Sequence, residues 1–180
     1  MWRRFAGRPV FISAGHGDHR KGFDLFLDAA RGIMLHLPDA QFVWLGALDG
    51  WAQGLAAKAQ AGGLPLLCPG FVADSLAWYV AARVYLLTSR QDPGPTTVIH
   101  AAAMGVPFVG YATDIGLRGV ADHLGRFVPA DRPADFVRAA LDLARRDNRV
   151  ERRRLRHVVL KATSFGSYTD AILAIVSPRP

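Results

Sequence analysis

Residues 83–111 read RVYLLTSRQDPGPTTVIHAAAMGVPFVGY and carry the clearest structural signal in this chain. Two short apolar runs, 84–88 and 107–111, predict buried strands, and the small residues of 96–104 between them predict a helix. A turn rich in proline and glycine, DPGPTT, joins the first strand to that helix. Strand, turn, helix and strand in this order are typical of a parallel sheet whose crossovers are helices.

The same alternation continues on both sides of this unit. Further strands are expected at 9–14, 41–46, 64–68 and 126–128, and further helices at 22–36, 51–61, 74–81, 133–146, 150–161 and 166–176. The strands are almost continuously apolar, which is expected when helices cover both faces of a sheet. The sequence therefore predicts an α/β fold: a doubly wound, parallel, six-stranded sheet with helices on both faces and ligands at the carboxyl ends of its strands.

Length and composition indicate one globular domain that spans residues 1–180. Apolar residues make up 51% of the chain and charged residues 21%, which excludes a disordered protein. No apolar run reaches the roughly 18 residues that a membrane span requires, and the N-terminus lacks a signal-peptide core. Cys68 is the single cysteine, so we expect no disulfide framework, no cysteine metal site and a reducing, cytoplasmic location.

The net charge of +7 is concentrated in the last quarter of the chain. The basic residues there are Arg145, Arg146, Arg149, Arg152, Arg153, Arg154, Arg156 and Lys161. Such a segment could face nucleic acid, anionic lipid or an acidic partner, or it could be a solvated helix face. No aromatic residues lie between the arginines, so we expect no nucleic-acid partner. Peripheral contact of residues 145–161 with the anionic inner face of a membrane stays open.

The turn between Asp92 and Thr97 combines a carboxylate with the start of a helix, and His100 follows eight residues after the aspartate. Gly94 lets the backbone approach a ligand closely, and Thr96 or Thr97 can cap the helix. A helix start of this kind presents backbone N–H groups and a partial positive charge to an anion such as phosphate. The alternative is an ordinary turn of a parallel sheet.

A second glycine-rich loop follows the first predicted strand and reads GHGDHRKG over residues 15–22. The Gly15 and Gly17 backbone could approach a diphosphate closely, and Arg20 or Lys21 could neutralise it. Neither a dinucleotide fingerprint nor a phosphate-binding P-loop pattern is present. The alternative is a solvent-exposed loop that is basic without binding anything.

Two other chemistries find little support in the sequence. His16 and His19 have no third ligand at metal spacing nearby, so we predict no metal site. A G-x-S-x-G nucleophile elbow is also absent. We therefore expect no bound cofactor.

Taken together, these segments resemble the C-terminal, nucleotide-sugar-binding domain of GT-B glycosyltransferases, specifically of glycosyltransferase family 4. RKGFDLF at 20–26 is similar to the family's donor-phosphate element, and PDAQFVWLG at 38–46 to its second strand. GFV at 70–72 is similar to the segment near the nucleotide base, and YVAARVYLLTS at 79–89 to the approach to the donor site. Residues 92–107 are similar to the family's E-x7-E element and the "EAMAxGxPVV" run that follows it. The implied fold is one Rossmann-like half of a GT-B enzyme.

The resemblance implies a role for each matched position. Asp92 takes the first acidic position, near the transferred sugar, and is the implied catalytic residue. The turn from Gly94 through Pro95 and Thr96 to Thr97 faces the donor, and Lys21 is the phosphate-binding lysine. The nucleoside side of the site is implied at Phe71, Val72 and His100.

Two departures from the family pattern bear on binding. His100 stands where the family has a glutamate that accepts hydrogen bonds from both ribose hydroxyls, and a neutral imidazole accepts only one. His16 replaces an arginine that often follows the first strand, and it is charged only part of the time near neutral pH. Donor binding is therefore weakened, altered in its choice of nucleotide, or lost.

The resemblance implies a nucleotide-sugar-binding domain of a retaining glycosyltransferase that moves a hexosyl group from a UDP- or GDP-sugar to an acceptor hydroxyl in polysaccharide or glycoconjugate biosynthesis. Helices over about 150–177 would reach back to an N-terminal acceptor domain that this chain lacks, so the chain alone would be inactive. Two alternatives stay open: a non-catalytic GT-B module that has lost donor affinity, and a GT-B sugar-nucleotide epimerase.

Overall fold

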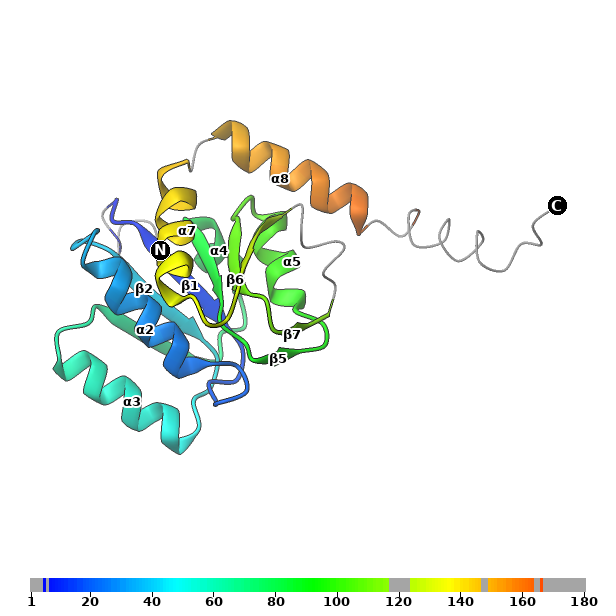
Figure 1. The fold of residues 1–180 in the computed structure, drawn as a ribbon. Helices are drawn as coiled ribbons and strands as arrows, with labels where there is room; N and C mark the ends of the chain where they lie inside the picture. Colours follow the sequence, from blue (N-terminus) through cyan, green and yellow to red (C-terminus); the bar gives the residue numbers. More distant parts are fainter. Residues whose placement is uncertain (1–4, 6, 117–123, 147–148, 164–165, 167–180) are drawn as a thin grey trace.

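The computed structural model describes residues 5, 7–116, 124–146, 149–163 and 166. Its centre is a six-stranded sheet in the order β3-β2-β1-β4-β6-β8, in which every neighbouring pair is parallel (Figure 1). The strands are β1 (Val10–Ala14), β2 (Gln41–Leu45), β3 (Leu66–Gly70), β4 (Val84–Leu87), β6 (Phe108–Tyr111) and β8 (Gly125–Val128). The predicted parallel, six-stranded sheet is confirmed.

Helices cover both faces of this sheet, as the apolar strands predicted. One buried cluster packs α2 (Phe23–Met34), α3 (Gly50–Ala61) and α7 (Pro133–Arg145) against one face. A second cluster packs α4 (Leu76–Ala81), α5 (Thr96–Ala103) and α8 (Arg149–Ala162) against the other. Because the sheet separates the two clusters, the domain has two cores and three layers.

The structure differs from the sequence prediction in several places. The third strand begins two residues late, because Pro65 has no N–H to donate and the Leu64 N–H bonds back to the Ala59 carbonyl. The fourth helix begins at Leu76 because the Asp74 carboxylate accepts the Leu76 N–H. The two-residue strands β5 (Gln91–Asp92) and β7 (Asp114–Ile115) pair beside the sheet, where no strand was predicted. Of the predicted helix 166–176, all but its first residue lies outside the described part of the chain.

The strand order reverses direction between β1 and β4, which are neighbours at the middle of the sheet. The chain leaves β1 for β2 on one side and leaves β4 for β6 on the other. The loops at the carboxyl ends of β1 and β4 therefore diverge, and a crevice opens between them. In a doubly wound sheet this position is where ligands bind.

Helix α8 lies at the other end of the sheet, near the amino ends of the strands (Figure 1). Leu155 and Val159 are its buried residues and join the core beside α5. Among the described helices, none is long and apolar enough to cross a membrane.

Candidate functional site

The loop after β1 and the loop after β4 are joined by a network of hydrogen bonds. The Arg90 guanidinium donates to both carboxylate oxygens of Asp24 at 2.8 and 2.7 Å, and to the His19 carbonyl at 2.8 Å. The Arg90 N–H donates to the Arg20 carbonyl, and the Arg20 guanidinium donates to the Gln91 carbonyl at 3.2 Å. The two loops therefore form one braced unit at the crevice.

The Asp24 carboxylate is held ionised by this network. Burial alone would raise the pKa of Asp24, but the hydrogen bonds and positive charge of Arg90 lower it below its usual value of 3.8. Asp24 also lies in the first turn of α2, where a negative charge is favourable. It is thus a structural carboxylate of the braced unit.

Gly22 brings the two loops into direct contact. Its φ of +68° lies in the left-handed region, and a Cβ there would stand 2.0 Å from the Thr88 carbonyl oxygen. The Thr88 hydroxyl in turn donates to the Lys21 carbonyl at 3.3 Å. Only glycine fits between the start of α2 and the end of β4.

Lys21 and Asp92 form an ion pair at the centre of this unit. The Nζ–Oδ2 distance is 2.6 Å, and the side chains are 16% and 6% exposed. The Ser89 hydroxyl lies 3.4 Å from the same carboxylate oxygen. The aliphatic stem of Lys21 runs beside Gly15. A Cβ added to Gly15 would be at ordinary van der Waals distance from this stem. The sequence placed both residues in the site but did not predict that they pair.

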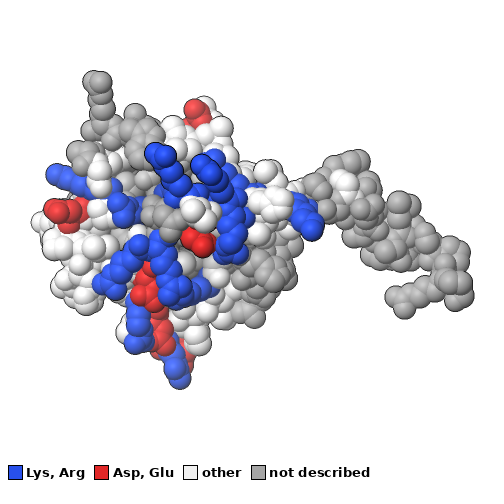
Figure 2. Space-filling view, turned by 90° about the horizontal axis from the view of Figure 1, so that it is seen from above, with Lys and Arg blue, Asp and Glu red and all other residues white. Residues whose placement is uncertain are grey.

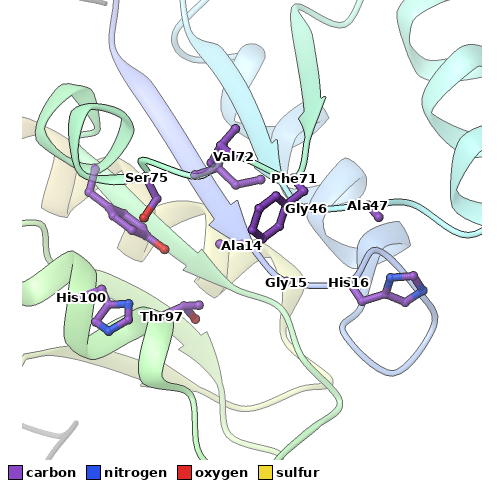
Figure 3. Close-up of a pocket in the computed structure, with 12 residues that line it drawn as sticks. Ala14, Gly15, His16, Gly46, Ala47, Phe71, Val72, Ser75, Thr97 and His100 are labelled. Carbon is purple, nitrogen blue, oxygen red and sulfur yellow. The ribbon is translucent and has the colours of Figure 1, made fainter.

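A pocket of about 430 Å³ opens at the carboxyl ends of the strands (Figure 3). Gly15, which the Lys21 stem runs beside, is one of its lining residues. Its lining comes from the ends of β1 and β2, the segment after β3, and the first turns of α4 and α5. The lining residues are Ala14, Gly15, His16, Leu45, Gly46, Ala47, Phe71, Val72, Ser75, Tyr79, Thr97 and His100. Phe71, 86% exposed, stands at its rim, so the pocket offers a flat apolar wall.

Six predicted site residues line this pocket: Gly15, His16, Phe71, Val72, Thr97 and His100. The other predicted site residues lie outside the lining: Gly17, Arg20, Lys21, Asp92, Gly94, Pro95 and Thr96. Gly17 is close to Leu48, whose methyl group would be 2.2 Å from an added Cβ, and its N–H donates to the Ala47 carbonyl. The glycine at 17 therefore has a packing reason of its own.

Sequence reasoning missed half of the pocket, including Gly46, Ser75 and Tyr79. Gly46 has φ +127°, and a Cβ there would stand 2.1 Å from the Gly15 carbonyl oxygen, so this glycine lets the ends of β1 and β2 meet. Its position at the end of a predicted strand was a usable signal. The sequence carried no such signal for Ser75 and Tyr79, because their position in the pocket depends on how α4 packs against the rest of the domain.

The buried Tyr85 bonds to two residues of the pocket lining, Ala14 and Thr97, and holds them in place. Its hydroxyl accepts the Ala14 N–H at 3.1 Å and lies 2.8 Å from Thr97 Oγ1, to which it donates. Burial raises the pKa of Tyr85, so the hydroxyl stays protonated. The prediction that Thr96 or Thr97 caps α5 is wrong: Pro95 precedes the helix and no side-chain cap forms. The Thr97 hydroxyl bonds to Tyr85 instead.

Two histidines belong to the pocket lining and come from different elements. His16 lies on the loop after β1 and His100 on α5, with Phe71 and Gly15 between them in the view of Figure 3. His19 does not reach the pocket and packs edge-on against Trp51, with ring centroids 5.9 Å apart. No group of three His, Cys, Asp or Glu side chains in the described ranges could hold a metal ion.

Comparison with known proteins places this chain in a family. Residues 8–146, more than three quarters of the chain, match the sequence profile described as glycosyl transferases group 1. The chain belongs to this family. A comparison with curated proteins finds no match.

Solved structures of glycosyltransferases share the fold of this group 1 domain. WaaG, a glycosyltransferase involved in lipopolysaccharide biosynthesis, superposes with a TM-score of 0.78 at 15% identity, over 98% of this chain and 50% of its own. Anabaena Alr3699/HepE in complex with UDP gives 0.76 at 16% identity, over 97% and 50%. The pneumococcal O-GlcNAc transferase GtfA, in complex with UDP and GlcNAc, gives 0.72 at 19% identity, over 96% and 37%. The group 1 domain thus spans between about a third and a half of these chains.

Proposed function

We propose that this group 1 domain is the C-terminal, nucleotide-sugar-binding half of a retaining GT-B glycosyltransferase of family 4. The enzyme would move a hexosyl group to an acceptor hydroxyl in polysaccharide or glycoconjugate biosynthesis. One observation carries the proposal: a pocket with an apolar wall opens at the strand-order reversal, and the stem of Lys21 runs beside Gly15 in its lining. UDP is the first donor nucleotide to test, because two of the similar structures are UDP complexes.

The parts of a nucleotide sugar match different parts of the site. The nucleoside would lie against Phe71 and Val72, with His100 facing the ribose. The diphosphate would lie toward Lys21 and the start of α5, where the turn from Gly94 to Thr97 precedes the helix. Asp92 would then stand next to the transferred sugar. Lys21 and Asp92 are paired at 2.6 Å. A bound diphosphate would therefore compete with the Asp92 carboxylate for the Lys21 ammonium group.

The contribution of these residues to transfer would be electrostatic. When the bond between the sugar and the diphosphate breaks, negative charge grows on the departing diphosphate, and Lys21 would stabilise it. An exposed helix end is worth about 0.3–1 kcal/mol in such a role, so the cation would supply the larger part. Arg20 would add charge nearby, although its guanidinium also braces the Gln91 carbonyl.

Calorimetry on the Lys21→Ala variant tests the site. We expect the wild-type chain to bind at least one of UDP, GDP and ADP, and Lys21→Ala to bind it at least roughly ten-fold more weakly, because a charge-assisted hydrogen bond is lost. Lys58→Ala removes an exposed lysine of α3 outside the pocket and is the matched control. Equal binding by wild type and Lys21→Ala, or binding by neither, contradicts the assignment.

A non-catalytic module is the second candidate, and two observations favour it. His100 and His16 replace residues that the family uses for ribose and phosphate, and Lys21 is already neutralised by Asp92. If this candidate is right, His100→Glu should strengthen UDP binding several-fold, since a carboxylate accepts from both ribose hydroxyls. Micromolar binding by the wild-type chain in the same titration would rule it out.

The rest of the enzyme is part of the proposal as well. An N-terminal domain would bind the acceptor and close over the pocket, so this domain alone would bind donor without transferring sugar. A cytoplasmic location fits a chain with a single free cysteine, Cys68. Burial raises the pKa of the Cys68 thiol to about 11, so the thiol stays protonated.

A further inference from the structure

The basic segment after α7 divides into two sets of residues with different surroundings. Arg152 and Arg156 both bond to the body of the domain. The Arg152 guanidinium donates to the Val80 and Ala82 carbonyls at 3.3 and 2.7 Å, and that of the exposed Arg156 to the Met104 carbonyl at 3.1 Å. These carbonyls lie at the ends of α4 and α5, where positive charge is favourable. Arg152 and Arg156 are therefore structural.

The remaining basic residues of α8 lie on its outer face, three or four positions apart. We define the outer face of α8 by seven exposed residues: Arg149, Val150, Arg153, Arg154, His157, Leu160 and Lys161. It combines cations with two exposed apolar side chains near the helix ends, since Val150 is 74% and Leu160 63% exposed. Figure 2 looks down on this end of the molecule and shows Lys and Arg gathered over it, with acidic side chains between some of them.

We propose that the outer face of α8 binds the surface of an anionic membrane. Charge complementarity carries the proposal: apart from the structural Arg152 and Arg156, residues 149–162 contain four Lys or Arg and one Glu, a formal charge of +3. The one Glu, Glu151, pairs with Arg154 at 3.0 Å. Interfacial helices combine such a basic face with a few apolar side chains that enter the headgroup region. A nucleic-acid surface would want aromatic side chains for stacking, and the outer face of α8 has none.

The place of α8 separates this surface from the pocket. Arg152 and Arg156 fix the helix to residues that precede β4 and β6, so α8 lies at the amino edge of the sheet. The pocket opens at the carboxyl edge. Helix α8 lies at the opposite end of the strands (Figure 1). The resemblance implied that helices over about 150–177 reach back to an N-terminal domain. A domain that closes over the pocket would meet the carboxyl edge, however, so the outer face of α8 at the amino edge is left to another partner. The helix also lies beyond residue 146, where the family match ends.

Co-sedimentation of the full chain with lipid vesicles tests the proposal. We expect binding to vesicles of phosphatidylcholine that contain phosphatidylglycerol, no binding to phosphatidylcholine alone, and release by high salt. The double variant R153Q/R154Q should bind at least roughly ten-fold more weakly, since each basic residue near the surface adds several-fold to the affinity. Leu160→Ser should weaken binding as well, because it removes an apolar side chain from the face.

A matched double variant controls for net charge. R31Q/K58Q also removes two positive charges, from α2 and α3 on the other face of the sheet, and should bind vesicles like the wild type. Thermal unfolding should show all variants folded, because every substituted side chain is exposed or half-buried. The proposal is wrong if the wild type ignores anionic vesicles, if both double variants bind equally, or if the chain binds a mixed-sequence RNA but not the vesicles. UDP binding is measured separately, so failure here leaves the pocket assignment unaffected.

Discussion

Tyr85 is the residue that joins the framework of the sheet to the pocket. Its hydroxyl holds Ala14 at the end of β1 and Thr97 at the start of α5, and both of these line the pocket. Tyr85→Phe removes these bonds and leaves two half-buried partners unsatisfied. We expect the free energy of unfolding to fall by about 1–2 kcal/mol and UDP affinity to fall several-fold. Urea unfolding and calorimetry measure the two effects.

Tyr111→Phe is the control for this prediction. Tyr111 is also buried in the sheet and stacks on Phe136 with ring centroids 4.3 Å apart, but its hydroxyl makes no hydrogen bond within the described part of the chain. Its substitution should leave UDP affinity unchanged. If Tyr85→Phe binds UDP as well as Tyr111→Phe does, the hydroxyl of Tyr85 does not position the pocket.

Among the elements, α2 is tied to the loop after β4 by the pair of Asp24 and Arg90. Because Arg90 lowers the pKa of Asp24 in the folded state, this pair stabilises the fold above the unfolded pKa, near 3.8, and the contribution is lost as the pH falls through the lower folded pKa. Asp24→Asn should therefore lower the free energy of unfolding by about 1 kcal/mol at neutral pH. The difference in unfolding free energy between this variant and the wild type should shrink at about pH 3. Urea unfolding at both pH values measures this.

Asp28→Asn provides the comparison on the same helix. Asp28 pairs with Arg31, but its side chain is 67% exposed, and exposed ion pairs contribute little to stability. We expect no measurable change at either pH. An equal loss in both variants would mean that α2 responds to its total charge and not to the bond between Asp24 and Arg90.

For the whole molecule, apolar periodicity was enough to predict the sheet and its helical layers. Runs such as 84–88 and 107–111 became central strands because continuously apolar segments can be buried on both faces. The two-residue strands β5 and β7 could not be predicted, because a strand of that length has no periodicity to recognise. Loop chemistry located the carboxyl edge of the sheet as the site.

The contacts inside the site were beyond sequence reasoning for a different reason. Lys21 and Asp92 are 71 residues apart, and the same separation joins Arg90 to His19. No local pattern reports such pairs. Thr97 shows the same limit: its residue type and position favoured a helix cap, but Tyr85 on the neighbouring strand takes its hydroxyl. Local chemistry predicted half of the residues that line the pocket, and tertiary packing determined the rest and the partner that each residue binds.

The position of α8 at the amino edge has an electrostatic consequence for the pocket. A strand of five residues, such as β1, is roughly 16 Å long. At physiological ionic strength the Debye length is about 8 Å, so interactions between solvent-exposed charges at the two edges are largely screened. An anionic surface against α8 would therefore not repel an anionic ligand at the pocket. Both could be held at once, and the affinity of each should be insensitive to the other.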